Sequence, residues 1–181
     1  LSTLISLRAD PNLTMLVTSG QVTSAAWLSS SPQLVRVLLE SKADYLKDHP
    51  LNGVAGRQSS ETLRAVLEAK CDPTRLAADG FGALHAVPVL GRANPYACSN
   101  MELLLSFRAD VNVRASPRGP IYWECLRAGL YASIWGLEGS VYLRKMASLP
   151  GATPLSVAAV FGDKALVQLL LEHAADLEIP N

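Results

Sequence analysis

Apolar and polar residues recur in one order along this chain, and each time the order ends at an Asp. It is visible in LISLRADPN (4–12), VLLESKADYL (37–46), AVLEAKCDPT (65–74), LLLSFRADVN (103–112) and LLLEHAADLE (169–178). The Asp residues are Asp10, Asp44, Asp72, Asp110 and Asp176. Their spacings are 34, 28, 38 and 66 residues, and 66 is twice 33. A repeated unit of about 33 residues, with local insertions and deletions, fits all of these spacings.

The residues before each Asp have the pattern of an amphipathic helix. Apolar side chains stand nine, six and five positions before the Asp, and these offsets share one helical face. The position six before the Asp holds Leu4, Leu38, Val66, Leu104 and Leu170. The position eight before it is polar, with Ser2, Arg36, Arg64, Glu102 and Gln168. The residue next to the Asp is always small, which indicates closely packed neighbouring units: Ala9, Ala43, Cys71, Ala109 and Ala175.

A second, shorter helix is predicted ahead of several of these helices. Its segments are HPLNGVA (49–55), GALHAVPVLG (82–91) and TPLSVAAVFG (153–162). Pro in the first turn costs no hydrogen bond, because the N–H that it lacks has no partner there. Gly at the end of a helix takes up a positive φ at little cost. The unit is therefore a pair of helices joined by a turn.

This pattern resembles an ankyrin repeat array, in which a β-turn precedes two antiparallel helices around the motif T-P-L-H-x-A. The resemblance is carried by Thr153-Pro154-Leu155, by Leu84-His85-Ala86 within DGFGALHA (79–86), and by the Asp-terminated segments. It implies an all-α fold, an ankyrin-like solenoid of stacked helix–turn–helix repeats with short β-turn or hairpin tips.

We expect a single array over residues 1–181. It comprises a partial second helix (1–10) and repeats at 11–44, 45–72, 73–110, 111–143 (degenerate) and 144–181. Since both ends fall within a repeat, we expect the array to be part of a longer chain or assembly.

The helix-closing position departs from the family pattern. The family has Gly two residues before the Asp, whereas this chain has Arg8, Lys42, Lys70, Arg108 and Ala174. If the left-handed geometry is kept, each of these residues bears about 1 kcal/mol of strain.

Residues 111–143 depart furthest from the repeat. They hold Gly129, Gly136 and Gly139, which weaken a helix, and an unusual density of aromatic residues: Tyr122, Trp123, Tyr131, Trp135 and Tyr142. Three interpretations stay open. The segment is a degenerate repeat whose aromatic residues fill packing gaps, a divergent surface patch that contacts a partner, or an inserted hairpin.

Composition argues against several functions. Lys and Arg together number 16, as do Asp and Glu, so no net field draws the chain to nucleic acid. The longest uncharged run is broken by Gly20 and Pro32 and is a poor transmembrane segment. Cys71, Cys98 and Cys125 lack the spacing of a metal site. We expect reduced structural thiols in an intracellular, cytoplasmic protein.

The sequence offers no catalytic motif. His49 and His85 fall where the resemblance implies a hydrogen bond at the start of a first helix, and His173 is predicted to lie on the surface. The His residues have no metal-site spacing, no Ser stands in a nucleophile motif, and no phosphate loop is present. We therefore expect no enzyme activity, no cofactor and no metal.

The expected function is a protein–protein interaction scaffold that binds through its hairpin tips and concave first-helix face. The candidate partner-binding residues are Arg75, Phe81, Val89, Leu90, Arg92, Arg114, Arg118, Arg144, Lys145, Val160 and Phe161. Most of them are cationic, which favours an acidic or mixed protein surface as partner, although ordinary solvated loop charge explains them equally well.

Two alternatives remain at this stage. The chain is a regulatory or targeting segment of a larger enzyme, or a peripheral subunit of a membrane protein complex that makes contact through residues 121–142.

Overall fold

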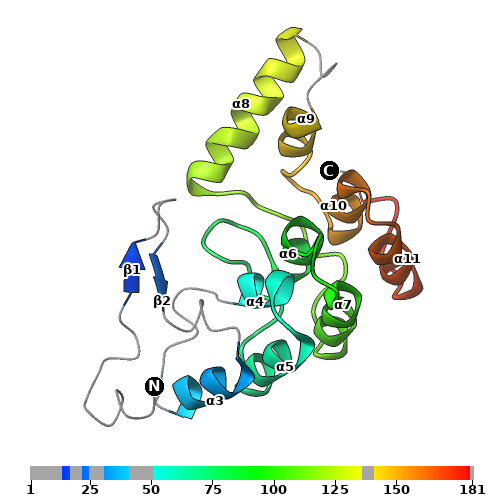
Figure 1. Cartoon of the computed structure of the whole chain (residues 1–181). Helices are drawn as coiled ribbons and strands as arrows, with labels where there is room; N and C mark the ends of the chain where they lie inside the picture. The colour runs from blue at the N-terminus through cyan, green and yellow to red at the C-terminus, as the bar shows by residue number, and fades with distance from the viewer. Residues whose placement is uncertain (1–13, 17–21, 25–30, 41–50, 136–140, 180–181) are drawn as a thin grey trace.

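The computed structural model describes residues 14–16, 22–24, 31–40, 51–135 and 141–179 (Figure 1). Most of the described elements are helices. They are α3 (Pro32–Glu40), α4 (Leu51–Arg57), α5 (Ser60–Glu68), α6 (Ala83–Leu90), α7 (Ala97–Ser106), α8 (Gly119–Trp135), α9 (Val141–Ala147), α10 (Pro154–Phe161) and α11 (Lys164–Glu172). Two short strands, β1 (Thr14–Leu16) and β2 (Val22–Ser24), precede them.

The helices stack in two rows, as expected for an ankyrin-like solenoid. The first helices form one row, in which α4 packs on α6 and α6 packs on α10. The second helices form the other, in which α3, α5, α7 and α11 follow one another (Figure 1). The predicted all-α repeat fold is confirmed.

One apolar core runs between the rows. Val66, Leu104 and Leu170, which stand at the same position of successive repeats, are each fully buried in a single cluster. The corresponding side chains of Leu4 and Leu38 lie outside the described residues. The small residues next to the Asp are buried as well: Cys71, Ala109 and Ala175.

The left-handed geometry after the second helices is kept without Gly. Lys70 and Arg108 have φ of 67°, and Ala174 has φ of 60°. At each of the last two, the next residue returns a hydrogen bond to the helix, from Ala109 N–H to Leu104 O and from Ala175 N–H to Leu170 O. The strain predicted from the sequence therefore applies at these positions, whereas Arg8 and Lys42 lie outside the described residues.

Buried amides tie adjacent repeats together. Asn100, fully buried in α7, donates through Nδ2 to Ala55 O and to Gln58 O, at 2.9 Å each. Its Oδ1 accepts from Ser60 Oγ at 2.7 Å. Asn94 donates to Gly56 O and Gln58 O at 3.1 Å. The carbonyl groups at the end of α4 thus find their partners in the next repeat.

Helices α8 and α9 do not occupy a place in the stack. Helix α10 packs directly on α6, and α11 packs directly on α7. Helices α8 and α9 pair with each other and project from the array (Figure 1). The interval of 66 residues between Asp110 and Asp176 is thus one repeat with a helical insertion, and not two repeats.

A two-stranded hairpin lies within the predicted repeat at 11–44. Its strands β1 and β2 are antiparallel, with Met15 opposite Thr23, and α3 follows them. The resemblance implied short hairpin tips in general, but the sequence pattern did not assign strands to these residues.

Candidate interaction surface

The helical insertion leaves the array and returns to it at one point. Ala115 N–H donates to Ala152 O at 2.8 Å, and Gly151 N–H donates back to Ala115 O at 2.9 Å. Ser116 N–H donates to Gly80 O at 2.9 Å. Gly80, at φ of 86°, has no room for a Cβ, which would lie 1.6 Å from Ser116 O. We call residues 116–150 the α8–α9 insertion; it emerges from the turn between α7 and α10.

His85 fixes the base of the insertion from inside the array. Its fully buried ring accepts a hydrogen bond from Gly82 N–H at Nδ1, at 3.1 Å. Because Nδ1 is the acceptor, Nε2 carries the proton and donates to Ala152 O at 3.0 Å. Burial lowers the pKa of His85, so its ring is neutral at pH 7. The predicted structural role of His85 is confirmed; His49 lies outside the described residues.

The contacts of His173 and of the three cysteines are those of structural residues and not of reactive ones. His173 Nδ1 lies 3.0 Å from Leu169 O at the end of α11, and the residue is exposed as predicted. All three cysteines are free thiols, and burial raises their pKa, that of Cys71 to about 11. A thiol with a raised pKa is a weak nucleophile at neutral pH.

The insertion covers part of the first-helix face. Buried Cys125 of α8 and Leu149 share an apolar cluster with Val157 of α10. Phe81, Val89 and Phe161 pack against this cluster from the array, and Ile121 and Met146 pack against it from the insertion. The chain's own helices therefore fill a surface that the sequence assigned to a partner.

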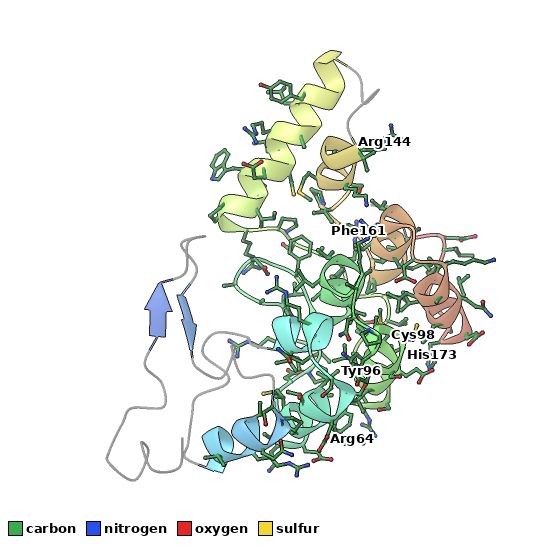
Figure 2. The ribbon with its side chains drawn as sticks, in the orientation of Figure 1. Arg64, Tyr96, Cys98, Arg144, Phe161 and His173 are labelled. Carbon is green, nitrogen blue, oxygen red and sulfur yellow. The ribbon has the colours of Figure 1, made fainter. Side chains whose placement is uncertain are left out.

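A cation–π contact adds to this covering. Lys145 Nζ of α9 lies 4.3 Å from the centre of the Phe161 ring of α10. Figure 2 shows Phe161 in the region where α9 approaches α10, with Arg144 on α9 further out. Two of the predicted binding residues are thus engaged with each other.

The remaining predicted residues do not form one continuous site. Arg75 and Arg118 lie at neighbouring turns, since Arg118 N–H donates to Asp79 O at 2.9 Å, and both side chains are exposed. Arg114 is exposed and donates through Nε to Gly151 O at 3.2 Å. Arg92 follows the opposite end of α6. Arg144 is exposed, whereas Leu90 and Val160 are half-buried.

The outer face of α8 is formed by Tyr122, Trp123, Leu126 and Leu130. The sequence indicated Tyr122 and Trp123 as candidates for a surface patch, but it did not indicate Leu126 and Leu130. The four side chains are 45%, 66%, 50% and 60% exposed. Spacings of three, four and seven residues place them on one side of the helix, opposite buried Cys125 and Ala128. Tyr122 and Trp123, together with Tyr131, which is 49% exposed, thus do not fill packing gaps, whereas the side chains of Trp135 and Tyr142 lie outside the described residues. The sequence shows that the four residues of the outer face have helical spacing, but spacing alone does not show which side of α8 faces the solvent.

Among the described residues, no three or more His, Cys, Asp or Glu side chains are grouped so as to hold a metal ion. Within the same residues, no helix has both the length and the apolar character needed to cross a membrane.

In a comparison with protein families, the last helix pair matches a family model. The family model described as Ankyrin repeat matches residues 150–181, the stretch that holds α10 and α11. This match supports the assignment to the ankyrin repeat family and a general role in protein–protein interaction. No curated protein matches the chain.

Proposed function

We propose that this chain is a protein–protein interaction scaffold that binds an acidic or mixed protein surface through the cationic turns at the edge of its array. The family match supports an interaction module in general. The particular surface is argued from the positions of the exposed cations and from the apolar residues that the insertion has already covered.

The observation that carries the proposal is the connection between two neighbouring turns. The backbone hydrogen bond between Arg118 and Asp79 joins the turn before α6 to the start of the insertion. Exposed Arg75 belongs to the first turn and exposed Arg118 to the second. Because the backbone that carries both guanidinium groups is already ordered, only the two side chains lose conformational freedom when they bind carboxylates, which favours recognition of an acidic surface.

The covered cluster explains why charge is more important than apolar contact here. Phe81, Val89 and Phe161 already pack against the insertion, so they offer little area to an incoming protein. A partner on this side contacts the turn residues first. The interaction should therefore weaken with added salt, because exposed charge pairs are screened.

Charge reversal tests the proposal. The chain is immobilised, proteins of its native source are bound, and the retained proteins are identified by mass spectrometry. The double variant Arg75→Glu/Arg118→Glu should retain the partner at least about tenfold less well, as expected when charge pairs become repulsive. The matched control is Arg36→Glu/Arg64→Glu, which makes the same charge change on exposed residues of the second helices. Equal retention by the test variant and the control would contradict the proposal.

A further inference from the structure

We propose that Ser116 is a phosphorylation site for a proline-directed protein kinase, and that its modification releases the acidic partner. The residue lies in RASPRGP (114–120), in the segment that joins the array to α8 (Figure 1). The site itself is argued from the structure of this segment. The effect on binding rests on the proposed function above, because the phosphate lies among cations of the same turns.

Three Ser or Thr residues of the chain are followed by Pro, and two of these pairs have a structural reason. Ser31 precedes Pro32, the first residue of α3, and its carbonyl oxygen accepts a hydrogen bond from Val35 N–H at 3.1 Å. Thr153 is the buried N-cap of α10, and Pro154 begins that helix. A Ser or Thr followed by Pro is typical of the start of a helix. Helix capping therefore explains both of these pairs.

The third pair, Ser116-Pro117, lies outside the helices. Residues 113–118 belong to no helix or strand, and α8 begins only at Gly119. The side chain of Ser116 is exposed to solvent. A Pro restricts the residue before it to the extended region of backbone conformation, so this hydroxyl is presented on an extended chain. An exposed hydroxyl on an extended chain, with Pro as the next residue, is the substrate that a proline-directed kinase binds.

Burial alternates along this segment as it does in an extended strand. Arg114, Ser116 and Arg118 are exposed, whereas Ala115 is buried and Pro117 is half-buried. Side chains two residues apart on an extended chain share one face, so the three exposed side chains leave the segment on its outward side. At about 3.3 Å per residue, each Arg lies about 7 Å along the chain from Ser116, within reach of a phosphate on its Oγ.

The inner side of the segment is fixed to the array. Ser116 N–H donates to Gly80 O and Arg118 N–H donates to Asp79 O, both at 2.9 Å. Asp79 holds the only carboxylate of residues 75–82, and its Oδ1 accepts a hydrogen bond from Phe81 N–H at 3.1 Å. This carboxylate is thus engaged within its own turn. The contacts to the array hold the segment in place and leave its outward side accessible to a kinase.

Phosphoryl transfer to Ser116 places negative charge between two cations. The γ-phosphoryl group of ATP moves to Ser116 Oγ, its bond to ADP breaks, and the hydroxyl proton passes to the catalytic Asp of the kinase. A phosphoserine carries a charge of about −1.5 to −2 at pH 7 and three acceptor oxygens, which suit the guanidinium groups of Arg114 and Arg118. The phosphate therefore neutralises the local positive charge and repels an acidic partner.

Treatment of the unphosphorylated chain with a purified proline-directed serine kinase and Mg–ATP tests the site. Peptide mapping by mass spectrometry should find phosphate on Ser116 at a rate at least about tenfold above that on Ser31, because Ser31 is held at the start of a helix. Ser116→Ala should remove the main product, and Pro117→Ala should remove it while the hydroxyl is kept. The matched control is Ser31→Ala, which should take up phosphate as the unchanged chain does.

A phosphorus NMR titration of the phosphorylated chain tests the contact with the two Arg residues. The second pKa of the phosphoserine should lie about half a pH unit below its value in the same chain unfolded in urea, as expected for exposed ion pairs. Arg114→Gln/Arg118→Gln should remove most of this difference. The control Arg36→Gln/Arg64→Gln, on exposed residues of the second helices, should leave it unchanged. Equal pKa values in the folded and the unfolded chain would overturn this contact.

Retention of the partner by the phosphorylated chain tests the effect on binding. It should fall at least about tenfold, and kinase-treated Ser116→Ala should retain the partner as before. The proposal is overturned if Ser116 of the folded chain is not modified, or is modified no faster than Ser31. A phosphorylated chain that still retains the partner overturns the regulation alone. The variant Arg75→Glu/Arg118→Glu then decides the proposed function separately.

Discussion

His85 Nε2 donates a hydrogen bond to Ala152 O at 3.0 Å and so joins two repeats across the whole length of the insertion. The two residues are 67 positions apart in the sequence. Ala152 O also accepts from Ala115 N–H at 2.8 Å. The carbonyl group of Ala152 thus accepts two hydrogen bonds: that from His85 joins the last repeat to the preceding one, and that from Ala115 closes the base of the α8–α9 insertion.

The neutral state of His85 predicts a loss of stability in mild acid. Its pKa is lowered in the folded chain by burial, so the unfolded state binds the proton more readily. The contribution is therefore present above the unfolded pKa, about 6.5, and is lost as pH falls below it, by at most about 1.4 kcal/mol per pH unit. Urea unfolding at several pH values between about 7.5 and 5.5 measures it. His85→Gln should be less stable at neutral pH and should show a smaller decline with acid; an unchanged decline would assign it to other groups.

Asn100 is predicted to be a major link between repeats. Asn100→Ala leaves Ala55 O and Ser60 Oγ without their present partner, and it leaves Gln58 O with the hydrogen bond from Asn94 alone. Loss of these buried hydrogen bonds should lower the free energy of unfolding by about 2–3 kcal/mol. Urea unfolding followed by circular dichroism measures the change. Ser99→Ala is the control, because Ser99 is an exposed neighbour on the same helix and should change stability by less than about 0.5 kcal/mol.

Gly56 is predicted to be required for the close contact of α4 with α6. A Cβ at this position would lie 2.6 Å from Leu90 Cβ and 2.9 Å from Ala86 O. Gly56→Ala should therefore lower the thermal midpoint, with a cost of about 1–3 kcal/mol from overpacking. Gly129→Ala provides the contrast, since a Cβ there meets nothing within 4 Å. It should raise stability by about 0.5–1 kcal/mol through helix propensity. Equal effects of the two substitutions would refute the packing argument.

Arg108 is predicted to be a position where Gly stabilises the fold. Its φ of 67° is strained for any side chain with a Cβ. Arg108→Gly should raise the free energy of unfolding by about 0.5–1 kcal/mol, since the strain relieved exceeds the entropy that Gly adds to the unfolded chain. The comparison is Arg64→Gly within α5, which should destabilise by about 1 kcal/mol. A loss of stability in Arg108→Gly would show that the left-handed residue is not under strain.

Removal of the insertion tests its separation from the array. A variant in which two Gly residues join Ala115 to Gly151 should still unfold cooperatively, because α6, α7, α10 and α11 keep their mutual contacts. It should also lose solubility, since Phe81, Val89 and Phe161 lose their cover. Deletion of α6 and α7 (83–106) should abolish cooperative unfolding. A collapse of the first variant would place the insertion within the stack.

The repeated helices were predictable because the burial of each helix position follows from its offset from the Asp, which is a local pattern in the sequence. Val66, Leu104 and Leu170 share one offset from the Asp and one buried environment. The left-handed geometry at Lys70 was predictable for the same reason. The interval of 66 residues was predicted to hold two repeats because it is twice the repeat length. It holds one repeat and the α8–α9 insertion, and the length of a segment does not show whether its helices stack in the array or project from it.

The candidate surface was predicted less completely. Arg75 and Arg118 are exposed at the turns as expected. Phe81 and Phe161 were expected to be open to a partner, but the insertion packs on them. That covering is a tertiary contact between distant segments, which no local pattern records. For α8, both sides of the helix carry apolar residues, so periodicity alone could not identify the side that faces outward.

The shared carbonyl of Ala152 has a consequence for how the molecule opens. When the last repeat separates from its neighbour, the hydrogen bond from Ala115 N–H is lost together with that of His85. The amide of Ala115 should therefore exchange with deuterium at the rate at which α10 separates from α6. Exchange at this one amide reports on two contacts at once: that between the last two repeats and that at the base of the insertion.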